Sequence, residues 1–130
     1  MREILFKAKS LDDGEWVEGS YSYVEHLGEH LILSSEKVDM GFDICFTTAQ
    51  YRIDENTLCQ YTGLTDKNGY AIWENDIVKL DEDFYIVTWE KDDAMFALED
   101  VGLIESFRNA DSKWCEVVGN IIDNPEFFNE

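Results

Sequence analysis

Short runs of β-forming residues, each closed by turn residues, are the feature that most limits how this chain can fold. Trp16–Val24 alternates in steps of two, and the Asp12-Asp13-Gly14 sequence before it is a strong hairpin signal. We therefore predict strands near residues 2–8 and 15–24, joined at that turn. Further runs follow at short spacing, which is typical of a small antiparallel meander or barrel. These later runs are DICFTT, TLCQYTG, DIVKL, FYIVTW, AMFAL and WCEVVGNII.

Three segments have a less certain local structure. YVEHLGEHLIL places Val24, Leu27 and Leu31 at helical spacing. Gly28 in its middle costs a helix about 1 kcal/mol, so two strands around HLGEH fit equally well. DVGLIESFRN fits a strand or a helix, and DNPEFF predicts a turn or a short closing helix. The chain as a whole is expected to be mainly β, with small antiparallel sheets.

Length and composition indicate one domain with a real core. The chain has 130 residues, of which 45% are hydrophobic, enough for a domain of this size to bury most of its apolar side chains. No apolar stretch approaches the ~20 residues of a membrane span, and the first apolar run is too short for a signal peptide. Cys45, Cys59 and Cys115 are odd in number and far apart. They therefore predict reduced thiols in a cytoplasm rather than a disulfide framework.

Charge is the strongest compositional signal. The chain carries 29 acidic and 10 basic residues, for a net charge of −19. Binding to nucleic acid or to an anionic membrane needs cations, so both are disfavoured. Two interpretations stay open, a self-repelling soluble surface and a docking face for a basic protein partner. The residues proposed for such a face are Asp81, Glu82, Asp83, Asp92 and Asp93.

No pattern predicts a catalytic centre or a cofactor site. HLGEH matches the H-x-x-E-H zinc-peptidase pattern, which makes His26, Glu29 and His30 weak candidates for metal ligands. That chemistry needs a stiff helix and a third protein ligand, and Gly28 weakens the helix. The chain has only two histidines and no glycine-rich phosphate loop. We therefore predict no catalytic residues, no cofactor and no bound metal.

The stretch YTGLTDKNGYAIWENDIVKL, residues 61–80, has the composition of a tight turn between strands. Asn68-Gly69 is predicted to supply two positions with positive φ. Asp66 and Asp76 are expected to bond to the backbone. The predicted turn residues are Gly63, Asp66, Asn68, Gly69, Asn75 and Asp76, and the predicted packing residues are Tyr61, Leu64, Ile72, Trp73, Ile77 and Val78. The four tryptophans are expected in core and inter-strand packing.

Three stretches together resemble the YopX family of phage and prophage proteins. They are ILFKAKSLDDGEWVEGSY, TLCQYTGLTDKNGYAIWENDIVKL and EVVGNIIDNPEFF, in the order that the family has them. The chain departs from the family pattern in three places. Lys7-Ala8 stands where Arg-Gly is usual, Cys59 replaces a common glycine, and Asn75 replaces the glycine of E-G-D. Asn tolerates positive φ better than most residues, so the turn at Asn75 is expected to form.

The resemblance implies a β-rich fold with a part similar to SH3-type barrels, and it carries no catalytic residues. We expect a single domain over residues 1–130, with an N-terminal β segment at 1–56 and an SH3-like barrel at 57–130. The expected function is that of a non-catalytic, phage- or prophage-encoded accessory protein that binds another protein in the bacterial cytoplasm. Two alternatives stay open, a small carboxylate- or metal-dependent hydrolase and a structural homo-oligomer.

Overall fold

The computed structural model of the protein describes residues 4–39, 41, 44–90, 95–100, 103–106 and 113–127. The chain divides into two compact units. The N-terminal unit is Glu3–Gln60, and the C-terminal unit is Tyr61–Glu130 together with Met1–Arg2. Each unit is described by itself below.

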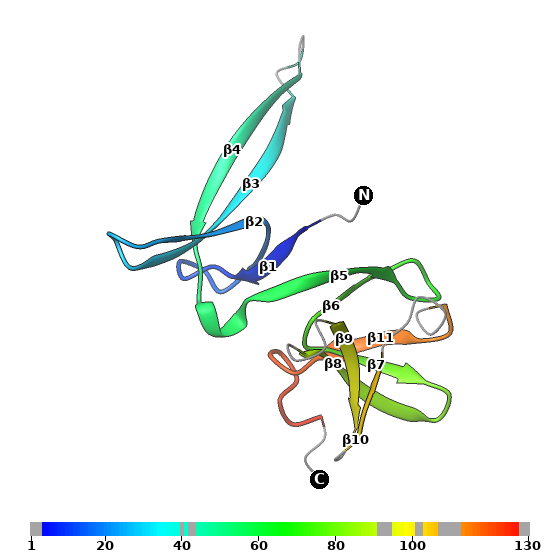
Figure 1. The fold of residues 1–130 in the computed structure, drawn as a ribbon. Coiled ribbons are helices and arrows are strands. Elements are labelled where there is room, and N and C mark those ends of the chain that lie inside the picture. Colours follow the sequence, from blue (N-terminus) through cyan, green and yellow to red (C-terminus); the bar gives the residue numbers. More distant parts are fainter. Residues whose placement is uncertain are drawn as a thin grey trace. The chain divides into compact units, whose positions relative to one another are not determined.

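The N-terminal unit is an antiparallel sheet with the strand order β4-β3-β2-β1-β5 (Figure 1). The first two residues of β5 pair with β1, and the rest of β5 belongs to the C-terminal unit. The strands are β1 (Phe6–Lys9), β2 (Trp16–Val24), β3 (Glu29–Asp39), β4 (Ile44–Arg52) and β5 (Cys59–Thr65).

Two hairpins of this sheet turn at a glycine with positive φ, which costs glycine no side-chain clash. Gly14 has a φ of 73° and Gly28 a φ of 65°. Hydrogen bonds of 2.9 Å from Gly14 N to Ser10 O and from Ser10 N to Glu15 O close the β1–β2 turn. The predicted hairpin at Asp12-Asp13-Gly14 is therefore confirmed. The first three residues of HLGEH lie in the turn between β2 and β3, and Glu29 and His30 begin β3. Its two-strand interpretation is therefore correct, and its helical one is wrong.

Gly19 lies where β2 changes its partner strand. Trp16–Gly19 pairs with β1, and Ser20–Val24 pairs with β3. A Cβ atom on Gly19 would overlap the carbonyl oxygen of Leu33 and lie 2.8 Å from its carbonyl carbon. This close approach of two backbones explains a glycine inside a strand, where glycine is otherwise unfavourable.

The core of the N-terminal unit forms on one face of the sheet. Ala8, Ile32 and Ile53 are buried at its centre. The 3₁₀ helix η1 (Glu55–Thr57) follows β4, and the Asp54 carboxylate caps it by accepting from Asn56 N at 3.0 Å. Thr57 Oγ1 accepts from Lys9 N at 2.8 Å and donates to Asp54 O. The side chains packed around the centre are Phe6, Val17, Tyr21, Tyr51 and Leu58.

The C-terminal unit is a five-stranded antiparallel sheet with the order β10-β9-β8-β7-β11, preceded by a hairpin of β5 and β6 (Figure 1). β7 and β11 pair with a register shift between Val117 and Gly119. The strands are β6 (Ala71–Trp73), β7 (Asp76–Leu80), β8 (Asp83–Glu90), β9 (Met95–Asp100), β10 (Leu103–Ser106) and β11 (Glu116–Asn120).

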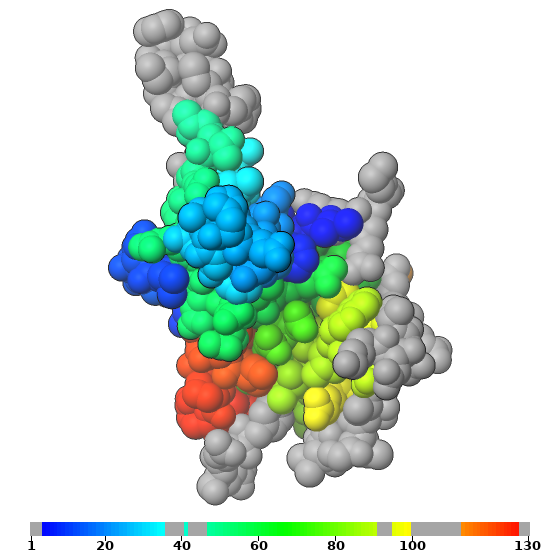
Figure 2. Space-filling view, turned by 60° about the vertical axis from the view of Figure 1, so that its left-hand side comes forward, coloured from blue at the N-terminus to red at the C-terminus, as the bar shows by residue number. Residues whose placement is uncertain are grey.

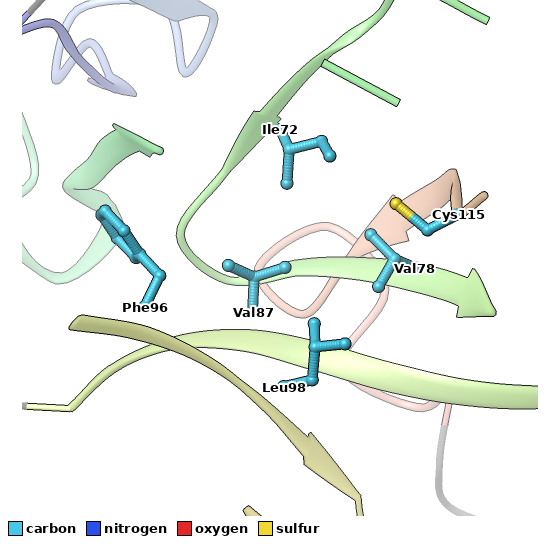
Figure 3. Close-up of a cluster of buried hydrophobic side chains, with 6 residues drawn as sticks. All are labelled: Ile72, Val78, Val87, Phe96, Leu98 and Cys115. Carbon is cyan, nitrogen blue, oxygen red and sulfur yellow. The ribbon is translucent and has the colours of Figure 1, made fainter. Parts of the chain in front are cut away.

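The core of the C-terminal unit gathers side chains from β6, β7, β8 and β9, and from the residue before β11 (Figure 3). Of the packing residues predicted in the stretch 61–80, four are buried and Tyr61 and Leu64 are half-buried. That stretch therefore supplies a hairpin and the start of the sheet. The buried cluster is Ile72, Val78, Val87, Phe96, Leu98 and Cys115.

A turn follows β11 and is built by two asparagines. Asn120 Oδ1 accepts from Ile122 N at 3.1 Å and from Asp123 N at 2.8 Å, and Asn124 Oδ1 accepts from Asn120 N at 3.3 Å. Gly119 leaves room for Asn124, because a Cβ there would lie 2.7 Å from Asn124 Oδ1. The segment predicted as a turn or a short helix is thus a turn, and no helix occurs at residues 121–127.

The predicted mainly β fold of small antiparallel sheets is confirmed. The strand pairs of the described residues do not close the five-stranded sheet into a barrel. DVGLIESFRN contributes the last residue of β9 and all of β10, and its residues 101, 102 and 107–109 lie outside the described part of the chain. Among the described residues, none forms a helix with the length and hydropathy that a membrane span requires.

Two cysteines are buried, and one tryptophan lies outside the core. Cys59 and Cys115 are buried and are not in a disulfide, and the side chain of Cys45 lies outside the described part. Trp73 is buried, and Trp89 packs edge-on against Phe96 with 4.9 Å between ring centroids. Trp114 is 74% exposed, so its predicted place in the core is wrong. It lies in the turn before β11, outside the sheet.

Candidate binding site

A cavity of about 270 Å³ opens in the N-terminal unit between the start of β3, the end of β4 and the start of η1. Backbone hydrogen bonds fix its walls. Leu11 N donates to Arg52 O, Asp54 N to Lys9 O, and Ile53 N to His30 O, over 2.9 to 3.0 Å. The residues that line it are Leu11, Gly28, Glu29, His30, Arg52, Ile53, Asp54, Glu55 and Asn56.

Two of the lining side chains, His30 and Glu55, form a polar chain with Tyr21. The Tyr21 hydroxyl lies 2.6 Å from His30 Nδ1, and His30 Nε2 lies 2.8 Å from Glu55 Oε2. A neutral imidazole with its proton on Nε2 satisfies both contacts, because it accepts from Tyr21 and donates to Glu55. The Tyr21 and His30 rings are stacked, with 6.0 Å between centroids, and the Tyr23 ring lies against His30 at 4.7 Å.

The surroundings of Tyr21 keep its hydroxyl protonated. Burial raises the pKa of Tyr21 above its ordinary value, and the nearby Glu55 and Tyr23 raise it further. A tyrosine that acts as a nucleophile needs its pKa lowered instead. The phenol is therefore suited to donating a hydrogen bond that holds His30 in place.

Carboxylates dominate the charge around the cavity. The Arg52 guanidinium lies 3.6 Å from Asp12 Oδ1 and 4.0 Å from Glu29 Oε1. Glu29, Asp54 and Glu55 line the cavity together with Arg52, so its lining holds three carboxylates and one guanidinium. Leu11 and Ile53 contribute apolar side chains to the wall of the cavity. A cationic group on an aliphatic stem is the ligand that such a site attracts.

The three weak metal candidates do not meet at one point. His26 is exposed in the turn between β2 and β3, whereas Glu29 and His30 begin β3. Glu29 faces Arg52, and His30 is engaged by Tyr21 and Glu55. The helical spacing that would place His26 and His30 on one face is absent from this hairpin. Within the described part of the chain, no group of three or more His, Cys, Asp or Glu side chains could hold a metal ion.

The predicted turn around Asp66 is held by that buried carboxylate. Oδ1 accepts from Asn68 N and Tyr70 N, and Oδ2 accepts from Val117 N, all at 2.9 Å. Gly69 has a φ of 85°, but Asn68 is not among the described residues with positive φ. The prediction of two such positions is therefore wrong. The N–H of Gly69 donates to Asp66 O and closes a four-residue turn. Positive φ is needed only at the last residue of this turn, Gly69.

Gly63, predicted as a turn residue, lies inside β5 instead, where its φ of 85° falls between the register-shifted pairs with β6. Asn75 lies in the β6–β7 turn as predicted, with a φ of 73°. Asp76 is buried, and its Oδ2 accepts from Trp73 N at 2.8 Å. Asn75 N donates to Val87 O at 2.7 Å, and Asn75 O accepts from Ile121 N at 3.0 Å. Asp76 thus holds the β6–β7 turn, and Asn75 joins that turn to β8 and to the residue after β11.

Part of the predicted acidic docking face lies on the turn between β7 and β8. Asp81, Glu82 and Asp83 are exposed there, and Asp92 and Asp93 lie outside the described residues. A second hollow, of about 250 Å³, borders Asp81 and is also lined by Lys67, Lys79, Trp114 and Glu116. The predicted acidic face is therefore less uniformly acidic than the sequence indicates, because Lys67 and Lys79 line the hollow beside Asp81.

Sequence reasoning missed most of the cavity. It selected Glu29 and His30 through a zinc pattern, but not Tyr21, Arg52 or Glu55. The acidic pair Asp54-Glu55 directly after a predicted strand was the available signal. The cavity itself could not be foreseen, because it depends on β2, β3, β4 and η1 meeting in space.

Fold and cavity together define a small, acidic, mainly β protein with a cavity lined by three carboxylates and one guanidinium. The sequence matches the model of the YopX protein family over residues 5–129. The chain therefore belongs to the YopX family, and the resemblance drawn from its sequence is confirmed.

A solved structure supports the same fold. The crystal structure of protein EF1440 from Enterococcus faecalis is similar, with a TM-score of 0.69 and 22% sequence identity. The match covers 99% of this chain and 100% of that one. No curated protein matches the chain.

Proposed function

We propose that this protein is a non-catalytic accessory protein, encoded by a phage or prophage, that binds a basic protein partner in the bacterial cytoplasm. The acid-rimmed cavity of the N-terminal unit is the observation that carries the proposal. A lysine or arginine side chain of the partner enters it, with its ammonium or guanidinium group near Glu29 and Glu55. Its aliphatic stem lies against Leu11 and Ile53, which line the cavity.

The net charge of −19 strengthens this choice of partner. A protein field of one sign raises the encounter rate with a partner of the opposite sign, and salt screens that effect. Phage or prophage origin is proposed from membership of the YopX family. A cytoplasmic location is supported by the buried, reduced Cys59 and Cys115.

We further propose that the C-terminal unit is an SH3-like barrel. Five short antiparallel strands around one core, with a register shift in the β7–β11 pair, support this arrangement. An experimental structure that pairs further residues at the edges of this sheet would establish the closed form.

The rival enzymatic function has one observation in its favour, the chain Tyr21–His30–Glu55. The raised pKa of Tyr21 opposes its use as a nucleophile. Equilibrating the protein with zinc or manganese and measuring bound metal separates the two functions. Tight, stoichiometric metal that is lost in His30→Ala would favour the hydrolase.

The binding function is tested with a partner captured from host lysate and then purified. Glu29→Gln with Glu55→Gln removes two charges at the cavity, and Glu82→Gln with Asp83→Asn is the matched control on the β7–β8 turn. We expect the cavity variant to lose about tenfold in affinity, roughly 1.4 kcal/mol, and the control to stay close to wild type. Equal affinity for all three proteins would contradict the cavity as the binding site. A stronger effect in the control would move the site to the predicted acidic face.

A further inference from the structure

The β3–β4 hairpin extends well beyond the sheet that carries it. β3 and β4 form nine residue pairs, but β2 reaches β3 only from Glu29 to Leu33. The six pairs from Ser34↔Ala49 to Asp39↔Ile44 have no third strand among the described residues. Figure 1 shows this part of the hairpin projecting from the rest of the N-terminal unit, and Figure 2 shows the cyan and teal residues at its base extending beyond that unit. An isolated two-stranded ribbon is marginally stable in water, so a further strand would stabilise it.

The outer edge of β4 lacks the features that keep sheet edges from pairing. Residues 44–51 contain no charged residue and no proline, although 30% of the chain is charged. The nine pairs with β3 show no register shift, so no bulge turns the edge away. Thr47, Thr48 and Gln50 are exposed. Natural proteins usually protect an edge strand with charges, prolines or bulges, and residues 44–51 have none of them.

The other edge strands of the described residues differ from β4. β10 contains Glu105, β11 begins at Glu116, and β6 has only three residues. Residues 34–39 of β3, the other edge of the projecting ribbon, include Glu36, Lys37 and Asp39. Residues 44–51 of β4 are thus the long, uncharged edge among these strands.

We propose that two copies of this chain associate through antiparallel pairing of β4 with β4. Pairing of a strand with its own copy forms a two-fold, self-complementary interface. Like charges directly opposite each other destabilise such pairs. Self-pairing of β10 or β11 can place glutamates near one another, whereas self-pairing within residues 44–51 cannot. An axis between Thr47 and Thr48 sets each threonine opposite the other threonine of the second copy and continues the ribbon as a four-stranded sheet.

The charge of the two copies makes this association dependent on salt. Each copy carries −19, so the copies repel one another at low ionic strength. The Debye length falls from about 10 Å at 0.1 M salt to about 3 Å at 1 M, which screens the repulsion. Salt therefore strengthens self-association. Binding of a basic partner has the opposite dependence, so the two interactions can be told apart.

The test is sedimentation velocity over a range of concentrations at low and high salt. We expect the mass to rise toward twice that of the monomer, and to do so at a lower concentration in high salt. The variant Thr47→Lys with Thr48→Lys, and the variant Thr47→Glu with Thr48→Glu, should each stay monomeric. Their equimolar mixture should form the mixed dimer, which native mass spectrometry identifies by mass.

Matched controls place the same charges on β2 instead of β4. Ser20→Lys with Ser22→Lys, and the corresponding glutamate pair, change exposed residues that do not lie on the β4 edge. The dissociation constant of the dimer should be at most about twice the wild-type value in these controls. Circular dichroism checks that every variant is folded. A wild-type protein that stays monomeric at all concentrations in high salt overturns the proposal. Dimers that persist in both folded β4 variants overturn it as well, since their interface must lie elsewhere.

Discussion

At the scale of single residues, the conspicuous polar side chains of the family-like stretches serve the backbone. Asp66 is buried and accepts three backbone N–H groups, one of them from Val117, 51 residues away. Asn120 does the same for the turn after β11. An aspartate that satisfies buried donors in this way organises structure, and its presence in a motif does not indicate catalysis.

Asp66→Asn is expected to destabilise the protein by about 1–3 kcal/mol. The amide has one acceptor oxygen, so its NH₂ group must face at least one backbone N–H that the carboxylate satisfied. Chemical denaturation measures the change in the free energy of unfolding. Asp83→Asn, at an exposed position, is the control and should differ from wild type by less than about 0.5 kcal/mol. Equal stability of Asp66→Asn and wild type would remove the role assigned to this carboxylate.

Tyr21→Phe is expected to make the protein less sensitive to alkaline pH. The pKa of Tyr21 is raised in the folded state, chiefly by burial, so the folded state favours the protonated phenol. Its contribution to stability is complete below the ordinary tyrosine pKa of about 10 and is lost as pH rises above it. Unfolding is measured from pH 8 to about pH 11. Tyr70→Phe, which removes an exposed hydroxyl, is the control. An identical alkaline loss in Tyr21→Phe and wild type would contradict the assignment.

At the scale of elements, β2 connects the two halves of the N-terminal sheet through Gly19. We expect Gly19→Ala to cost about 1–3 kcal/mol, as overpacking typically does, because the new methyl group would overlap the backbone of Leu33. Thermal unfolding measures the loss. Ser20→Ala, the exposed neighbour, is the control. Hydrogen exchange should locate the loosened bonds between β2 and β3. A variant as stable as wild type would show that the strands can separate at this point without cost.

Local elements could be predicted from the sequence, and long-range ones could not. Gly14 and Gly28 mark turns that join neighbouring strands, and the signal for each hairpin lies within a few residues. The pairing of β1 with β5 and of β7 with β11 joins distant segments, and no local pattern specifies such partners. The predicted positive φ at Asn68 is wrong, because this turn needs a positive φ only at Gly69. The cavity was missed for the same reason as the long-range pairs, since Tyr21, His30 and Glu55 come from three elements.

At the scale of the whole molecule, the excess of acidic residues leaves a repulsion between negative charges that ion pairs cannot remove. Arg52 engages Asp12 and Glu29, and Lys67 lies 3.9 Å from Glu116. Even if each of the 10 basic residues neutralised one acid, a charge of −19 would remain. Self-repulsion of this kind destabilises a compact state while it keeps the protein soluble.

Added salt is therefore expected to raise the temperature of half unfolding. Between about 0.01 M and 0.1 M salt, the Debye length falls from about 30 Å to about 10 Å, so repulsion between distant carboxylates weakens. Asp81→Asn, Glu82→Gln and Asp83→Asn combined should raise stability at low salt by a few tenths of a kcal/mol and reduce the gain from salt. Asn suits position 81, where φ is 58°. Sodium and potassium chloride should act alike at equal ionic strength, because screening does not depend on the ion. A melting temperature that stays constant or falls with salt would contradict this prediction. It would mean that local interactions of the individual carboxylates outweigh the long-range repulsion between them.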